Sequence, residues 1–249
     1  MPEVIFLPFS THGESFPLTR YSVVAAVKSS NEAERRAAID AIAAAYWRPV
    51  YKYIRLRWNV QTEEAQDATQ DFFAQLIEKE FLATYDVNKA RMRTFLRTCI
   101  DRMMMNRSRD AVREKRGGGA AHLSLDFADA EHELAAASVP ASMDEFFERE
   151  WVRSLFGLAV ERMKASCTQA GKQKQFAVFE ACDLVDRDEK PSYVELARRF
   201  GIAVTDVTNY LSLTRREFRR CVLEQLRAMT GSDDEYRREA QALLGVDPK

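Results

Sequence analysis

Hydrophobic residues recur along this chain every three or four positions, which is the spacing of one face of an α-helix. No convincing run shows the strict apolar and polar alternation of a half-buried β-strand. The helical spacing covers about 18–58, 62–84, 91–114, 144–229 and 233–244. The pattern therefore predicts an all-α protein.

Interruptions of this pattern predict how the chain is organised. The glycine run at 117–119 ends the third helical segment, because glycine weakens a helix and favours a turn or linker. We expect an N-terminal arm at 1–17, a helical domain at 18–116, an acidic Gly-containing linker at 117–143, a second helical domain at 144–230 and a helical extension at 231–249.

Charge is sorted along the sequence although the formal net charge of the 249 residues is only −1. Residues 61–80 hold six acidic residues and one basic one, and residues 86–116 hold ten basic and four acidic residues. Residues 124–150 hold eight acidic residues against Arg149 alone. The total excludes a globally basic nucleic-acid binder, but the sorting favours partners of opposite charge. Solvated helix faces are the alternative interpretation.

Several classes of protein do not fit the composition. No apolar run approaches the roughly 18–20 residues that cross a bilayer, and the first thirty residues lack the pattern of a secretory signal. The four cysteines are far apart and form no CxxC pair, and the three histidines fall in predicted loops. We therefore expect a cytoplasmic protein with reduced thiols and with no catalytic residues, metal site or cofactor.

Residues 191–222 have the pattern of a helix-turn-helix. Ser192 followed by Glu195 is a capping box, and Gly201 stands where the tight turn favours positive φ. Thr205 or a neighbour is expected to cap the second helix. The shared core is predicted to contain Leu196, Phe200, Ile202, Val207 and Leu211. A plain helical hairpin with a glycine turn is the alternative.

The second helix of this motif would present its polar side to DNA. Asn, Ser and Thr side chains can hydrogen-bond base edges, and arginines can hold phosphates. Asp206 is a contrary feature, because a carboxylate near phosphate weakens binding. The residues expected outside are Asp206, Thr208, Asn209, Tyr210, Ser212, Arg215, Arg216, Arg219 and Arg220.

The region 46–109 contains two further amphipathic segments. In the first, Ala65, Ala68, Phe72, Phe73 and Leu76 share one face, opposite Glu63, Asp67, Gln70, Asp71 and Glu78. In the second, the core face is predicted to be Met92, Phe95, Leu96, Cys99, Ile100 and Met103, whereas Arg93, Arg97, Arg102 and Arg109 point elsewhere.

In order and spacing, these motifs resemble a bacterial sigma factor of the extracytoplasmic-function (ECF) group. The pattern from Asp67 to Phe73, the turn at Tyr85 and Asp86, and the stretch from Arg93 to Leu96 resemble region 2 of that group. Residues 191–222 resemble region 4. The segments 18–24, 115–119 and 144–151 resemble a particular subset of the group, and the likeness covers about 18–247.

The resemblance implies three sets of binding residues. The acidic helix would dock on the β′ clamp of core RNA polymerase through Glu63, Asp67, Gln70 and Asp71. The single-stranded minus-ten element, with a flipped base, would meet Asn88, Lys89, Arg91, Arg93, Arg102 and Asn106. The minus-thirty-five duplex would meet Thr205, Thr208, Asn209, Tyr210, Ser212, Arg215, Arg216 and Arg219.

Other expectations follow from the same resemblance. Region 4 would also bind the polymerase β flap, and the acidic linker would follow the path toward the active site and RNA exit. Asn106 replaces an Asp that is frequent in the group, and Asp101 and Asp110 interrupt the basic helix, so the minus-ten preference stays open. An anti-sigma factor or a serine/threonine kinase is a further expected partner.

The sequence thus favours a non-enzymatic transcription initiation factor that binds weakly to DNA when alone. A free-standing helix-turn-helix regulator would explain 191–222 but not the acidic helix, and a helical scaffold would not explain the arginines after the turn. Thr62 and Thr69 flank the acidic face, and both are interpreted as ordinary helix residues rather than phosphorylation sites. The segment 233–244 is either an autoinhibitory or partner helix, or one that packs on the second domain.

Overall fold

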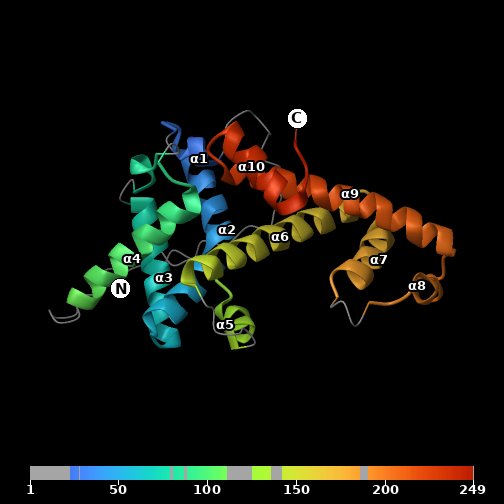
Figure 1. Cartoon of the computed structure of the whole chain (residues 1–249), viewed down its shortest axis with the longest axis horizontal. Coiled ribbons are helices and arrows are strands. Elements are labelled where there is room, and N and C mark those ends of the chain that lie inside the picture. Colours follow the sequence, from blue (N-terminus) through green and yellow to red (C-terminus); the bar gives the residue numbers. More distant parts are fainter. Residues whose placement is uncertain are drawn as a thin grey trace. The chain divides into compact units, whose positions relative to one another are not determined.

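The computed structural model describes residues 23–27, 29–78, 81–86, 89–110, 125–135, 142–185 and 190–248. Every regular element in these ranges is a helix, which confirms the all-α class for this part of the chain (Figure 1). The chain divides into two compact units. The first unit is Met1–Ser154 with Arg227–Glu239, and the second unit is Leu155–Leu226 with Ala240–Lys249.

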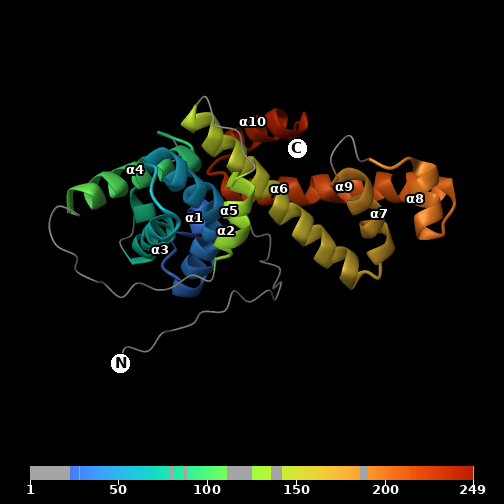
Figure 2. The same cartoon turned by 90° about the horizontal axis from the view of Figure 1, so that it is seen from below.

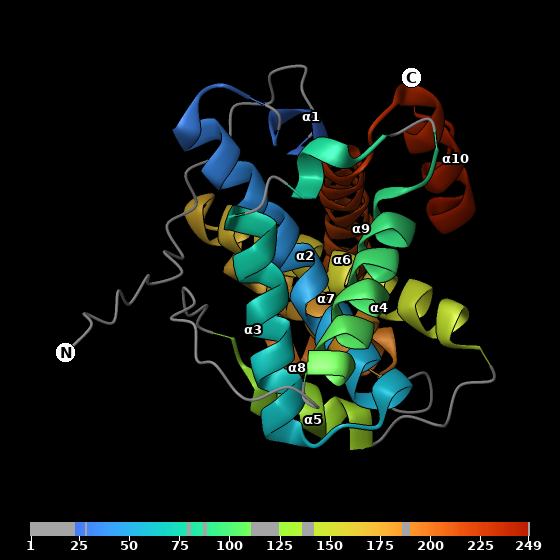
Figure 3. The ribbon, with the colours of Figure 1, turned by 90° about the vertical axis from the view of Figure 1, so that its left-hand side faces the viewer.

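The first unit is built around one long helix. Its elements are α1 (Val23–Ala26), α2 (Glu32–Trp58), α3 (Thr62–Glu78), the 3-10 helix η1 (Phe81–Thr84), α4 (Met92–Asp110), α5 (Phe127–Ala135) and the first parts of α6 (Met143–Gln169) and α10 (Asp233–Leu244). Helix α2 packs against α1, α3, α4 and α5 (Figure 3). Helix α2 therefore forms the centre of this unit, and the charged helices α3, α4 and α5 pack against it.

Local capping residues set helix ends that the periodicity did not locate. Helix α2 begins at Glu32 because the Asn31 side chain accepts hydrogen bonds from the backbone N–H of Ala33 and Glu34, at 3.0 and 3.4 Å. The segment predicted over 62–84 is α3 followed by the separate helix η1. The predicted residues 18–22 and 111–114 lie outside the described residues, as does the expected arm at 1–17.

Aromatic packing joins the start of α6 to the first unit. Tyr46 of α2 stacks on Trp151 of α6 with ring centroids 6.4 Å apart, and Tyr53 meets Phe147 edge to face at 5.5 Å. All four rings are buried, and burial of large rings is a main source of core stability. The first unit consequently extends to Ser154, whereas the sequence placed the start of the second domain at residue 144.

The expected linker at 117–143 contains a helix. Helix α5 lies along α2, where the Phe127 ring packs against Trp47 and Tyr51 with centroids 5.7 and 4.8 Å away (Figure 2). The described residues of this acidic segment are therefore fixed to α2 by ring packing as well as by charge.

The second unit contains the rest of α6, α7 (Gln173–Asp183), α8 (Tyr193–Phe200) and most of α9 (Val204–Met229). Its aromatic core centres on Phe218, whose ring lies 5.8 Å from Phe156 and 5.6 Å from Phe179. Buried residues of α8 and α9 include Leu196, Val207 and Leu211, three of the five core residues predicted for the helix-turn-helix. Phe200 and Ile202 are half-buried.

The turn between α8 and α9 has the local structure predicted from its sequence. Ser192 Oγ accepts from the Glu195 N–H at 3.3 Å, and the Glu195 carboxylate accepts from the Ser192 N–H at 2.7 Å, which confirms the capping box. Gly201 has a φ of 61°, the left-handed conformation that favours glycine. Thr205 lies inside α9 rather than capping it, and the Ala203 N–H donates to Asp206 instead.

Candidate nucleic-acid interface and acidic surface

Helix α3 separates an apolar face from an acidic one, as its sequence predicts. Ala65, Ala68, Phe72, Phe73 and Leu76 are all buried. On the other side Glu63 and Asp67 are exposed, and Gln70 and Asp71 are half-exposed. We call these four residues the acidic surface of α3. The Asp71 carboxylate forms an ion pair with Arg107 of α4, so part of this surface is already engaged within the first unit.

Thr69 does not belong to that surface. Its side chain is 0% exposed, and its hydroxyl donates a 2.7 Å hydrogen bond to the Ala65 carbonyl oxygen one turn earlier. The spacing from Ala65 to Thr69 to Phe73 places all three on one helix face, so periodicity gives the signal for this burial. Thr62 is the first residue of α3, which agrees with its interpretation as an ordinary helix residue.

Helix α4 presents its basic residues unevenly. Its core face contains Met92, Leu96, Cys99 and Ile100 as predicted, but Met104 is buried where the sequence favoured Met103. Burial raises the pKa of the Cys99 thiol to about 11, which keeps it protonated at neutral pH. The described cysteines Cys99, Cys167, Cys182 and Cys221 are all buried and unpaired.

The six residues proposed for single-stranded DNA fall into different environments. Arg102 and Asn106 are exposed on α4, and Lys89 is exposed 3.7 Å from Asp86. Arg91 is about half exposed just before α4, whereas Asn88 lies outside the described residues. Arg93 differs from all of these, because its side chain is only 5% exposed.

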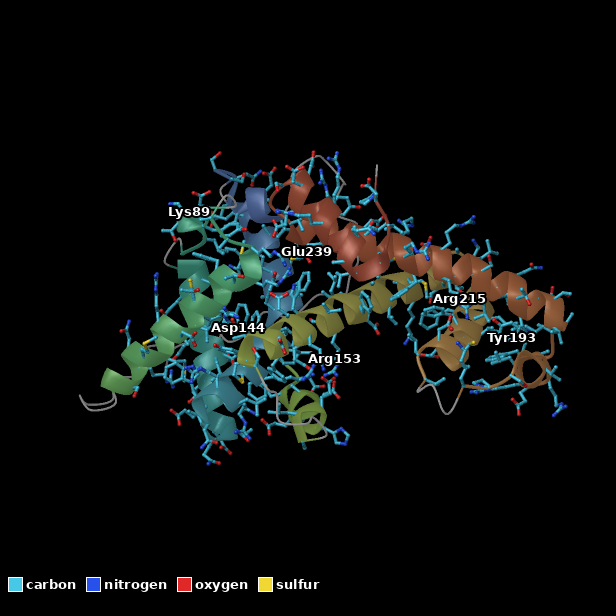
Figure 4. The ribbon with its side chains drawn as sticks, viewed as in Figure 1. Lys89, Asp144, Arg153, Tyr193, Arg215 and Glu239 are labelled. Carbon is cyan, nitrogen blue, oxygen red and sulfur yellow. The ribbon has the colours of Figure 1, made fainter. Side chains whose placement is uncertain are left out.

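Arg93 is held in a buried cluster of opposite charges. Its guanidinium lies over the Trp151 ring, 4.4 Å from the centroid, and it pairs with Glu148 of α6 and with Glu239 of α10, the latter at 2.9 Å. Figure 4 labels Glu239 and Asp144, which belong to the carboxylates facing α4. The sequence treated Arg93 as a surface cation because its partners lie far along the chain. In this arrangement Arg93 is not open to DNA.

The neighbouring arginines share these carboxylates. Glu239 also pairs with Arg91 at 2.9 Å, and Asp144 at the start of α6 pairs with Arg97 at 2.6 Å. The N-terminal turns of α4 thus have their charge balanced by residues from α6 and α10. Arg102, farther along the helix, is an exposed cation.

Helix α9 presents the polar residues that the sequence assigned to duplex DNA. Thr205, Thr208, Asn209, Ser212, Arg215, Arg216 and Arg219 are exposed, and Tyr210 is half-exposed. Val204 and Leu213 are also exposed, at 44% and 50%. Sequence reasoning omitted these two apolar side chains, although apolar groups on a reading helix can contact the methyl group of thymine.

One arginine of this set is oriented by an aspartate from α7. Asp183 accepts from Arg215 Nε and Nη2 at 2.6 and 2.8 Å, and from Lys190 at 3.1 Å. Figure 4 labels Arg215 on α9 and Tyr193 on α8, within the same unit. Burial raises the pKa of Asp183, but the hydrogen bonds from Arg215 and Lys190 outweigh burial and hold it below the usual range. Arg220 is paired with Glu217 and Glu224 rather than left for a phosphate.

A second basic stripe, absent from the sequence prediction, lies on α2 beneath α5. Arg48, Lys52 and Arg55 follow one another at helical spacing and pair with acidic residues of α5. Lys52 is 1% exposed and contacts both Glu133 and Glu150. The hydrogen bond from Arg55 lowers the pKa of Glu131 below its usual value, against the opposing effect of burial.

No described helix is long and apolar enough to span a membrane. Within the described ranges, His, Cys, Asp and Glu residues form no group of three suited to a metal ion. No protein-family model matches the sequence, and comparisons with curated proteins and with solved structures gave no match.

Proposed function

We propose that this chain is a sigma-type transcription initiation factor that binds core RNA polymerase and directs it to promoters. It has separate surfaces for the two tasks. The acidic surface of α3 binds the β′ clamp, Arg102 and Asn106 of α4 contact the melted minus-ten strand, and α9 reads the minus-thirty-five duplex. The phosphoryl transfer belongs to the polymerase.

The observation that carries the proposal is the helix-turn-helix in the second unit. Its capping box and its left-handed Gly201 fix α8 against α9, and α9 then exposes polar side chains followed by arginines. This arrangement is typical of a recognition helix that enters a major groove. The acidic surface lies on α3 in the other unit, where it repels DNA and suits a protein partner.

The polymerase surface is tested by reversing its charge. Glu63→Arg combined with Asp67→Arg should abolish capture of the chain by core polymerase and abolish run-off transcription, because both carboxylates become cations. Asp71 is left unchanged because it pairs with Arg107. The matched control reverses two other exposed carboxylates, Glu32 on α2 and Glu161 on α6. Undiminished capture of a folded Glu63→Arg/Asp67→Arg variant would refute the assignment.

A free-standing duplex-binding regulator is the second candidate, and it is favoured by the same helix-turn-helix. It assigns no role to the acidic surface of α3. Tight, sequence-specific binding to duplex DNA by the isolated chain, without response to core polymerase, would support it instead.

A further inference from the structure

Two buried carboxylates of α10, those of Glu235 and Glu239, make contacts within the first unit. The Glu239 carboxylate contacts two arginines that the sequence assigned to DNA. Glu239 is 4% exposed, and its carboxylate bridges Arg91 and Arg93. Glu235, one turn earlier, is also buried and accepts from the Gly231 N–H at 2.9 Å, which fixes the start of the helix. Arg227 lies over the Tyr236 ring, 4.9 Å from its centroid.

The energetics of this contact differ from those of an apolar core. A buried ion pair contributes little net stability, because the loss of hydration of both groups offsets their attraction. Removing one partner is costly only while the other has nothing to replace it. Phosphate offers an arginine the same kind of charge-assisted, bidentate acceptor as a carboxylate. A nucleic-acid phosphate can thus take the place of Glu239 without leaving Arg91 and Arg93 unpaired.

We propose that α10 is an internal competitor for single-stranded DNA, with the Glu239 carboxylate occupying the place that a DNA phosphate takes beside Arg91 and Arg93. This inference rests on the proposed function and names the regulation of its minus-ten surface. In the free chain the carboxylate keeps this surface closed. When α10 is displaced in the polymerase complex, Arg91 loses its carboxylate partner and Arg93 keeps only Glu148, so positive charge becomes available at the N-terminal end of α4.

The competition is tested with Glu239→Gln in the full chain, which keeps the side-chain shape and removes the charge. Binding of a fluorescein-labelled single-stranded oligonucleotide should become about threefold to tenfold tighter at low salt. The dependence of log K on log salt should become steeper by about 0.7 for each further phosphate that the arginines neutralise. Adding Arg91→Ala to this variant should remove most of the increase in affinity.

Asp234→Asn is the matched control. Asp234 lies on the same helix, its side chain is 86% exposed, and it is 3.8 Å from Arg237 rather than paired with Arg91. The substitution makes the same change in net charge, so it separates the local contact from a general electrostatic effect. Its affinity for the oligonucleotide should stay within about twofold of the unmodified chain, since one distant surface charge is largely screened.

Equal affinities of the Glu239→Gln and Asp234→Asn variants would overturn the competition and leave Glu239 as a structural contact. If the Glu239→Gln variant shows no cooperative thermal melting, the Glu239→Asp variant is measured instead. Its shorter side chain moves the negative charge away from both arginines. A different result would refute the proposed function itself: the unmodified chain would neither bind core polymerase nor support run-off transcription.

Discussion

Asp183 and Arg215 show that exposure alone does not determine what a cation can contribute to binding. Arg215 and Arg216 are adjacent and both exposed on α9. Arg215 is already paired in a bidentate manner with Asp183, whereas Arg216 makes no ion pair with a described residue. A DNA phosphate near Arg215 is also repelled by the Asp183 carboxylate. Arg215 should therefore contribute less to duplex binding than Arg216.

We therefore expect Arg216→Ala to weaken duplex binding more than Arg215→Ala does. Asp183→Asn should tighten binding and steepen the salt dependence of log K by about 0.9, which corresponds to one additional cation available to phosphate. The effect should be smaller in the Arg215→Ala background, where only Lys190 is left to be freed from Asp183. Salt titrations of fluorescence anisotropy with duplex DNA measure all of these chains, and equal slopes for Asp183→Asn and the unmodified chain would contradict the argument.

Among the helices, α5 illustrates how an acidic segment becomes part of a folded unit. Phe127 supplies ring contacts to α2, while the carboxylates of α5 neutralise Arg48, Lys52 and Arg55. The Glu131 side chain also accepts a 2.6 Å hydrogen bond from the Tyr51 hydroxyl. The helix therefore has an apolar anchor and a charge pattern complementary to the stripe beneath it.

This docking should depend on pH in a defined direction. The pKa of Glu131 is lowered on folding from its ordinary value of 4.5, so its contribution is fully present above that value. It is lost as the pH falls through the lower, folded pKa, because the unfolded chain then binds the proton more readily. Glu131→Gln should flatten the acid limb of a plot of unfolding free energy against pH, measured by denaturant titration. The flattening should be smaller when Arg55 is already replaced by Met, because only the Tyr51 hydroxyl then lowers the pKa of Glu131.

For the whole molecule, the important feature is that many cations are paired with carboxylates of the same chain. Glu239, Glu148 and Asp144 neutralise the first arginines at α4, and Asp183 does the same on α9. A net charge of −1 adds no long-range attraction to a polyanion. We therefore expect weak electrostatic attraction between the isolated chain and DNA, although the chain contains many arginines.

The isolated chain should accordingly bind promoter DNA weakly and with little sequence preference, and the complex with core polymerase should bind tightly. Electrophoretic mobility shifts with a genomic fragment pool, at one salt concentration and with polymerase present or absent, measure the difference. Polymerase without the chain is the control. A tight specific complex formed by the chain alone would contradict this expectation.

The features predicted correctly from the sequence depend on neighbouring residues. Ser192, Glu195 and Gly201 act within one turn of their own backbone, so the capping box and the left-handed turn follow from local chemistry. The apolar face of α3 follows from helical spacing in the same way. Such signals specify helices, turns and the exposed side of α9 without knowledge of the remaining chain.

Tertiary packing alone determined which charged residues remain at the surface. Arg93 contacts Trp151, Glu148 and Glu239, and Lys52 contacts Glu150. These partners are far apart in the sequence, whereas helical periodicity relates only residues that are a few positions apart. Aromatic packing likewise placed α5 and the start of α6 on α2. The sequence by itself determined helices with acidic and basic faces. Only the tertiary structure decided which of those charges neutralise one another, because ion pairing and burial depend on distance in space.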